Sequence, residues 1–248
     1  MTAGKEKIIW LDSAESTNAY AMSILSDSRP PEGIVIVTLN QTKGRGTDKN
    51  SWESEPGKNL TFSVILYPQM SADKQFIMNK AVSTGIYDYL ASEMSDTEVR
   101  IKWPNDIYIS DKKICGILIQ NSVKWCQFDY VIVGIGLNVN QLVFKSDAPN
   151  PVSMQMITGI QYNLDLVLEN LLFALNKRYQ QFISGEVNRI EADYVSKLYR
   201  LLEWHQFSVG GKTLTARITG AGKYGHLLLE TSGNKTIECD MKDVKFLI

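Results

Sequence analysis

Apolar residues along the chain follow two patterns, short β-branched runs and longer stretches in which they recur every three or four positions. The longer stretches predict helices over residues 16–26, 72–94, 164–182 and 186–202. The short runs predict strands at residues 33–39, 60–67, 99–103, 114–120 and 130–136. The first run is apolar throughout, which is typical of a strand covered on both faces. The last three strands are close in sequence, so we expect them to pair antiparallel.

The pattern changes after about residue 205, where short apolar runs alternate with glycine-bearing turns. Strands are expected at residues 213–218, 226–230, 236–239 and 244–247. Strands this short and closely spaced predict a small β-barrel. The pattern therefore indicates an α+β fold, with a mixed or antiparallel sheet packed with helices over residues 1–203 and a compact all-β domain over residues 204–248.

Composition indicates an ordered globular chain without a strong net charge. Of the 248 residues 44% are hydrophobic, and 26 basic residues stand against 27 acidic ones, so bulk charge does not favour a nucleic-acid or membrane-surface protein. Cys115, Cys126 and Cys239 are odd in number and far apart, which indicates a reducing compartment. The apolar run at residues 8–11 is too short for a signal peptide or a membrane span, so we expect a cytoplasmic protein.

A polar loop at residues 41–58 carries Gly44, Arg45 and Gly46, followed by Lys49 and Trp52. Glycines let the backbone approach a ligand closely, while the cations offer charge to a carboxylate or phosphate and the indole offers a stacking face. Taken alone, such a loop is more often a solvated connection between strands.

The segment Lys-Trp-Pro-Asn-Asp at residues 102–106 ends a strand whose alternation places Arg100 and Lys102 on one face. A cation held on a strand is well placed to stabilise a transferring phosphoryl group. The alternative is a lysine whose aliphatic stem covers the surface of the sheet.

Gly134 and Gly136 alternate along an apolar strand that is followed by Asn138. Two glycines on one face indicate close approach by a ligand or another backbone, although a β-bulge explains them equally well. Asn138 offers both a donor and an acceptor at the end of this strand.

Ser16, Thr17 and Asn18 precede the first predicted helix. Helix capping explains these residue types and is the first interpretation. The same short polar side chains could also contact a small polar ligand.

Taken in order, these segments resemble the biotin–protein ligases. The resemblance rests on Ser-Thr-Asn at 16–18, Gln-x-x-Gly-Arg-Gly at 41–46 with the later Trp52, Lys-Trp-Pro-Asn-Asp at 102–106, Lys-Ile-x-Gly-Ile-Leu at 113–118, and Gly-x-Gly-x-Asn-Val at 134–139. It covers most of the chain and extends to the segment at 225–230. It implies a catalytic domain of the class II aminoacyl-tRNA synthetase-like, biotin/lipoyl ligase type, followed by an SH3-like β-barrel.

The resemblance implies an ATP-dependent, AMP-forming ligase with biotin and ATP as substrates. The biotin carboxylate would attack the α-phosphate of ATP, pyrophosphate would leave, and a carrier lysine would then attack the biotinyl-adenylate. The implied partner is the biotin carboxyl carrier protein or domain of a biotin-dependent carboxylase, and a monomer or homodimer is expected. Mg²⁺ is expected to arrive with ATP, and the sequence identifies no metal ligands.

Carried over position by position, the resemblance implies that Lys102 and Arg45 are catalytic, with Lys102 between the carboxylate and the phosphate. The implied biotin-binding residues are Ser16, Thr17, Asn18, Gln41, Gly44, Arg45, Gly46, Lys102, Gly116, Gly134 and Gly136. The implied adenylate-binding residues are Arg45, Thr47, Lys49, Trp52, Asn105 and Asn138.

This chain departs from the family pattern at Thr47, where relatives usually carry a second arginine or a glutamine. Retention of the adenylate is then expected to depend on Arg45 and Lys49. We expect the loop at 41–58 to be mobile when empty and to fold over the adenylate. The 12 residues before Ser13 are too few for a helix-turn-helix module, so no DNA binding is expected.

Two alternatives stay open. A lipoate–protein ligase or octanoyltransferase would share the fold and differ at the ring end of the pocket. A non-catalytic biotin sensor would keep the pocket without turnover, which Thr47 makes conceivable. The presence of Arg45, Lys102 and Asn138 favours an enzyme, because a sensor of biotin alone needs no contacts to the adenylate.

Overall fold

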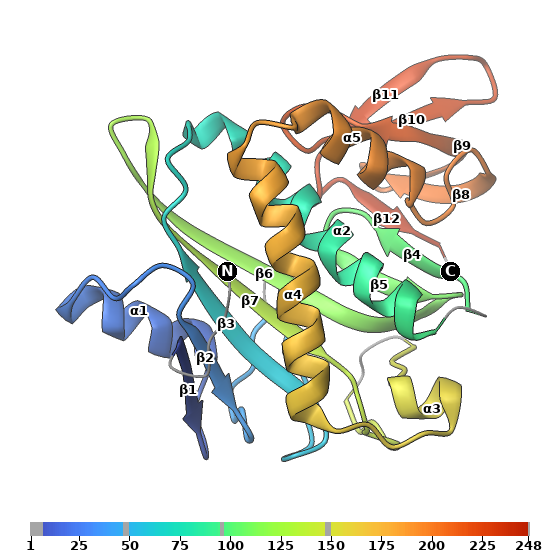
Figure 1. The fold of residues 1–248 in the computed structure, drawn as a ribbon. Helices are drawn as coiled ribbons and strands as arrows, with labels where there is room; N and C mark the ends of the chain where they lie inside the picture. The colour runs from blue at the N-terminus through green and yellow to red at the C-terminus, as the bar shows by residue number, and fades with distance from the viewer. Residues whose placement is uncertain (1–6, 47–49, 95–96, 147–149, 248) are drawn as a thin grey trace.

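The computed structural model describes residues 7–46, 50–94, 97–146 and 150–247, which form two β-sheets with helices on both faces of the larger one (Figure 1). The larger sheet has seven strands in the order β1-β2-β3-β7-β6-β5-β4. Their bounds are β1 Ile8–Leu11, β2 Val35–Thr38, β3 Leu60–Leu66, β4 Val99–Lys102, β5 Asp106–Ile109, β6 Lys112–Lys124 and β7 Gln127–Leu137. Only β1 and β2 pair parallel within it, which confirms the expected α+β fold with a mixed sheet.

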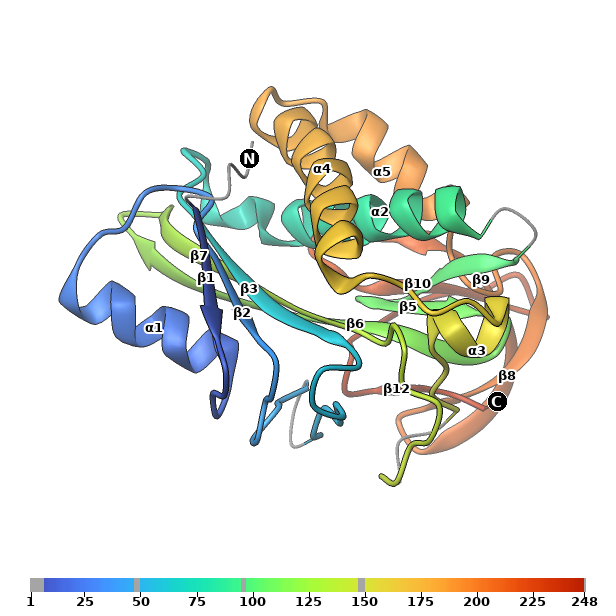
Figure 2. The ribbon, with the colours of Figure 1, turned by 60° about the horizontal axis from the view of Figure 1, so that its bottom comes forward.

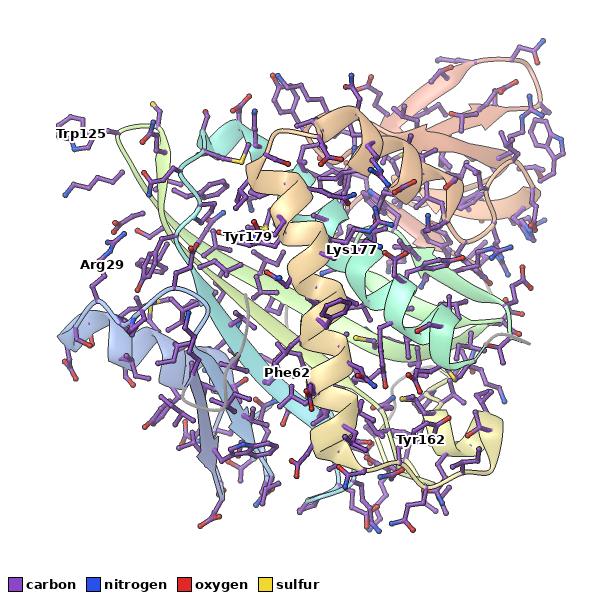
Figure 3. All side chains as sticks on the ribbon, in the orientation of Figure 1. Arg29, Phe62, Trp125, Tyr162, Lys177 and Tyr179 are labelled. Carbon is purple, nitrogen blue, oxygen red and sulfur yellow. The ribbon has the colours of Figure 1, made fainter. Side chains whose placement is uncertain are left out.

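Helices cover both faces of this sheet (Figure 2). One face carries α2 (Gln75–Glu93), α4 (Leu164–Ile183) and α5 (Val187–Ser196), and the other carries α1 (Thr17–Asp27). Within β2, Val35 and Val37 belong to the core under α2 and α4, while Ile36 packs with Ala21 of α1. Phe62 of β3 and Tyr179 of α4 lie between the sheet and that helical layer (Figure 3). Burial on both faces therefore explains the uninterrupted apolar run of β2.

The structure corrects two boundaries. Residues 106–109 were expected to connect two strands, yet they form β5, which pairs with β4 on one side and β6 on the other. The last predicted helix was expected to reach residue 202, but α5 ends at Ser196. Arg200 and Leu202 both have φ of 60°, which a helix does not accept, and Leu198 forms a parallel bridge to Ile101 of β4. A short helix, α3 (Met154–Thr158), was not expected.

The C-terminal strands form a separate five-stranded antiparallel sheet in the order β11-β10-β9-β8-β12. Their bounds are β8 Trp204–Val209, β9 Lys212–Ala221, β10 Leu227–Thr231, β11 Thr236–Cys239 and β12 Val244–Phe246. The change to short strands is confirmed, with β8 as an additional one. Closure into a barrel and a domain boundary at residue 203 stay predictions.

Consecutive residues at the end of β4 contact opposite parts of this C-terminal sheet. Trp103 Nε1 donates a hydrogen bond to the carbonyl of Gly225, between β9 and β10, at 2.9 Å. The ammonium of Lys102 lies 5.0 Å from the ring centroid of Phe246 in β12. The C-terminal sheet is thereby held against the β4 edge of the large sheet. Among the described residues, no helix has the length and apolar character needed to cross a membrane.

One buried guanidinium joins the three helices of the outer layer. Arg178 of α4 donates from Nε to Asp88 of α2 at 2.6 Å and from Nη1 to Asp193 of α5 at 2.5 Å. Its side chain is 9% exposed, whereas the two carboxylates are about a third exposed. The helices are therefore linked through a single residue that has little access to water.

Arg178→Leu should lower the free energy of unfolding by about 2–3 kcal/mol, because it leaves two carboxylates without their partner. The value lies at the low end for a broken buried ion pair since both carboxylates retain some water. Urea denaturation measures it. Arg189→Ala is the matched control, because Arg189 pairs with Glu186 at the surface and should matter little. Equal losses in the two variants would contradict this interpretation.

Candidate active site

A cleft that is open to solvent lies on the α1 face of the large sheet. Its lining residues are Ser16, Thr17, Asn18, Gln41, Arg45, Gly46, Trp52, Asp106, Lys113, Gly116, Ile117, Leu118, Gly134, Ile135 and Gly136. Strand register places Gly136, Gly116 and Asp106 in one row across β7, β6 and β5. Paired residues point to the same face of a sheet, so this row forms the floor of the cleft.

The start of α1 forms one end of the cleft, but not by the expected capping. Ser16 occupies the N-cap position and its side chain makes no capping hydrogen bond, so that interpretation is wrong. The backbone N–H of Thr17 instead donates to Oε1 of Gln41 at 2.9 Å. Gln41 therefore joins the loop after β2 to the first turn of the helix. The side chains of Ser16, Thr17 and Gln41 all line the cleft.

Asn18 is held by a network that the sequence did not reveal. Its Nδ2 donates to the carbonyl of Leu118 at 3.2 Å and to Oε1 of Gln120 at 3.0 Å, and its Oδ1 accepts from the hydroxyl of Ser63 at 2.6 Å. A Cβ at Gly134 would lie 2.3 Å from this Oδ1, which explains the glycine. Ser63 is fully buried, and its only signal in the sequence is a hydroxyl within a buried strand.

The indole of Trp52 lies across the floor of the cleft. A Cβ would come within 2.3 Å of this ring at Gly136 and 3.0 Å at Gly116, and a Cβ at Gly44 would come within 2.5 Å of the Trp52 carbonyl. Each of these glycines therefore admits Trp52 rather than forming a β-bulge. The indole N–H is buried without a hydrogen-bond partner, so it can serve a ligand as a donor.

Two cations line the cleft, and one of them differs from the expected residue. Arg45 is exposed, and Nζ of Lys113 lies 2.7 Å from the carboxylate of Asp106. Lys102 pairs with Asp106 across β4 and β5, so its side chain leaves the same face of the sheet. Its ammonium, however, lies 3.2 Å from the hydroxyl of Tyr108 and against the ring of Phe246.

Lys102 is not among the residues that line the cleft and lies beside Phe246 of the C-terminal sheet, so its expected catalytic role stays a prediction. Burial lowers the pKa of its ammonium, and the nearby charge of Asp106 acts in the opposite direction. Lys113 belongs to the Lys-Ile-x-Gly-Ile-Leu segment, so the signal for it was present in the sequence without being assigned to chemistry.

Two further residues expected at the adenylate lie outside the cleft lining, and their roles stay predictions. Asn138 is buried outside the cleft lining, with Nδ2 donating to the carbonyl of Val152 at 3.0 Å. Asn105 donates to the carbonyl of Ile117 at 2.6 Å and lines a different cleft beside the C-terminal sheet. Thr47 and Lys49 lie outside the described residues. Within the part of the chain that the structure describes, no three His, Cys, Asp or Glu side chains are grouped to hold a metal ion.

Comparison with known proteins identifies one family. A model described as the biotin/lipoate A/B protein ligase family matches residues 10–138. The chain is 28% identical over 229 residues to the bifunctional ligase/repressor BirA of Bacillus subtilis, across 90% of this chain and 66% of that protein. It thus spans just under two thirds of that relative. It is 23% identical to the biotin–[acetyl-CoA-carboxylase] ligase of Mycobacterium tuberculosis, across 94% of this chain and 86% of the other.

The fold matches a solved structure over nearly its whole length. The biotin protein ligase of Aquifex aeolicus, in complex with biotin and ATP, superimposes with a TM-score of 0.80 at 25% identity, covering 98% of this chain and 99% of that one. The α+β fold of the biotin/lipoyl ligase type is thereby confirmed, whereas closure of the C-terminal strands into a barrel stays a prediction.

Gly136→Ala should force the Trp52 indole out of its position, because the new methyl group would lie 2.3 Å from the ring. Quenching of tryptophan fluorescence by acrylamide should then increase by about the contribution of one of the five tryptophans. The same change in a Trp52→Phe background should produce no rise. Gly220→Ala is the control, since a Cβ at this position would lie 3.9 Å from its nearest neighbour, Cδ1 of Leu228. Unchanged quenching in Gly136→Ala would show that the ring is placed differently.

Proposed function

The chain belongs to the biotin/lipoate A/B protein ligase family, and on this premise we propose that it is a biotin–protein ligase, which activates biotin with ATP and transfers it to a carrier lysine. One observation supports this most. One cleft brings together the polar side chains of Thr17 and Asn18, a glycine-bearing floor, and the cations Arg45 and Lys113. Biotin has the matching groups, a polar ureido ring, an apolar tail and a carboxylate.

In this proposal the ureido ring binds at the start of α1. Ser16, Thr17 and Asn18 supply short donors and acceptors there, and Gln41 closes the same end. The fully buried Ser63 hydroxyl keeps Asn18 in one orientation, so the polar end is organised before the ligand arrives. The tail extends over the glycine floor, where it displaces the Trp52 indole that lies directly on Gly116 and Gly136 in the structure.

Activation brings the biotin carboxylate against the α-phosphate of ATP. These two anions repel each other, so a cation between them lowers the barrier. Lys113 is the side chain proposed to act there, and Asp106 holds its ammonium in position at 2.7 Å. Arg45 also lines the cleft. A carboxylate oxygen attacks phosphorus, the bond to the bridging oxygen breaks, and pyrophosphate leaves with biotinyl-AMP formed.

Transfer then uses the unprotonated amine of a lysine on a biotin carboxyl carrier domain. The amine attacks the acyl carbon, the acyl–phosphate bond breaks, AMP leaves, and the amine gives up its proton to form the amide. Trp52 covers part of the floor and helps to exclude water, which would otherwise hydrolyse the mixed anhydride. Mg²⁺ is expected to bind with ATP through its phosphates and water.

Lys113→Met should slow biotin-dependent ATP–pyrophosphate exchange by about 10²–10³-fold, because it removes the cation from the reacting centre. Lys102→Met tests the catalytic role that the resemblance implies for Lys102, and a loss below about tenfold would exclude Lys102 from the reacting centre. Thermal unfolding of both variants serves as the control for folding. A loss below about tenfold in Lys113→Met would remove Lys113 from its proposed role.

The decisive experiment offers a carrier domain to the protein with ATP and either biotin or lipoate. Mass spectrometry should show one biotinyl group added to the carrier and no lipoyl group, because the polar end of the cleft suits a ureido ring rather than a dithiolane. Lipoyl addition would identify the other acyl substrate of this family. Biotin binding without pyrophosphate release or carrier modification would identify a sensor.

A further inference from the structure

A chain of hydroxyl groups runs behind the polar end of the cleft and ends on Asn18. The Oγ of Ser63 lies 2.6 Å from Oδ1 of Asn18 and 2.7 Å from Oγ1 of Thr17. Ser63 is fully buried in β3 and is not among the residues that line the cleft, whereas Thr17 and Asn18 both line it. Ser63 therefore contacts two lining residues without reaching the cleft itself.

The amide group of Asn18 is held in a single orientation. Its Nδ2 donates to the carbonyl of Leu118 at 3.2 Å and to Oε1 of Gln120 at 3.0 Å, which engages both of its hydrogens. A flipped amide would place its oxygen against the carbonyl oxygen of Leu118, and two acceptors repel each other. The Oδ1 of Asn18 therefore faces Ser63, and because an amide oxygen carries no proton, it can only accept.

The protons of Ser63 and Thr17 each have one place in this chain. Oxygen atoms that lie 2.6 Å or 2.7 Å apart need a proton between them. The Ser63 hydroxyl has a single proton, and Oδ1 of Asn18 requires it. The proton between Ser63 and Thr17 must then belong to Thr17, so the Thr17 hydroxyl donates inward to Ser63. The other acceptor near Thr17, Oε1 of Gln41, is more distant at 3.4 Å.

The direction of this chain decides what Thr17 offers to the cleft. Since its proton points inward, only lone pairs of Oγ1 remain for a ligand, so Thr17 acts as an acceptor. Beside it, Oε1 of Gln41 accepts from the backbone N–H of Thr17 at 2.9 Å, which leaves Nε2 of Gln41 as the donor. The polar end thus presents one acceptor next to one donor. A cyclic urea carries the complementary N–H and carbonyl side by side, whereas a dithiolane ring carries no donor.

We propose that Ser63 is a positioning residue that determines ring specificity by fixing Thr17 as the acceptor for a ureido N–H. The inference rests on the proposed function, because it takes the start of α1 as the end that binds the ring of biotin. A ligand ring without an N–H would leave the buried Oγ1 of Thr17 unpaired, which costs more free energy than a typical hydrogen bond contributes. Without Ser63 the Thr17 hydroxyl is free to rotate, and it no longer favours a donor over an acceptor.

The test measures the Kd of biotin by calorimetry in Ser63→Ala, which removes the acceptor of the Thr17 proton. Affinity for biotin should fall about tenfold, and affinity for desthiobiotin, which keeps the cyclic urea and lacks the sulfur, should fall by the same factor. Thr61→Val is the matched control, because Thr61 is also buried in β3 and its hydroxyl donates to the carbonyl of Thr38 at 3.1 Å. Thr61 is outside the cleft lining, so this change should leave biotin affinity unaltered.

A second comparison separates positioning from a merely structural effect. If Ser63 acts through Thr17, Ser63→Ala should lower biotin affinity no further in a Thr17→Val background, because the hydroxyl that Ser63 orients is gone. Pyrophosphate exchange by Ser63→Ala should show a raised KM for biotin and a nearly unchanged kcat, since the ring end takes no part in the reaction at the carboxylate. Should Ser63→Ala fail to fold, Ser63→Cys tests the same contacts, because a thiol is a weaker donor and acceptor.

The outcomes distinguish this inference from the proposed function. If the unchanged protein binds no biotin, the proposed function fails and the inference fails with it. If the unchanged protein binds biotin and folded Ser63→Ala binds it equally well, only the inference fails. An equal loss in the Thr17→Val background would show that Ser63 acts on the fold rather than through Thr17, and would also overturn it. A loss for biotin without one for desthiobiotin would place the effect at the sulfur-containing ring, with the same consequence.

Discussion

The space above the large sheet exists because side chains are absent at Gly116, Gly134 and Gly136. Both faces of the sheet are otherwise covered, so any ordinary residue in these places would project into the cleft. The freed volume admits Asn18, from the first turn of α1, and Trp52, from the loop between β2 and β3. The positions of Asn18 and of the Trp52 indole in the cleft therefore both depend on the three glycines.

The cleft is bounded by two different structures on one face of the sheet. Helix α1 covers the side of β2 and β3, whereas Phe246 of the C-terminal sheet covers the side of β4. Across the gap the row Gly136, Gly116, Asp106 and Lys102 follows from strand register. Asp106 belongs to the cleft lining. Lys102 is the next residue along this row and lies beside the rings of Tyr108 and Phe246.

Strand and helix positions were largely predictable because periodicity reports which faces are buried. Residues 33–39 illustrate this, since a continuous apolar run correctly predicted a strand covered on both faces. The choice between Lys102 and Lys113 was not predictable in the same way. Both lysines lie in motif segments and both point to the cleft face of the sheet. Only the tertiary structure shows that Phe246 of β12, more than a hundred residues further along the chain, lies against Lys102.

The contact between Glu53, which follows Trp52, and Gln141, which follows β7, could not be predicted from the sequence for a related reason. Glu53 and Gln141 are separated by 88 positions, and each is an ordinary polar residue in a loop. Their importance follows from what they accept, namely backbone N–H groups that no local pattern marks as needing a partner. The N–H groups of Lys145 and Ser146 donate to Glu53, so the loop after β7 is held by the loop after β2. Neither residue lines the cleft, so only the tertiary structure shows that each holds the loop of the other.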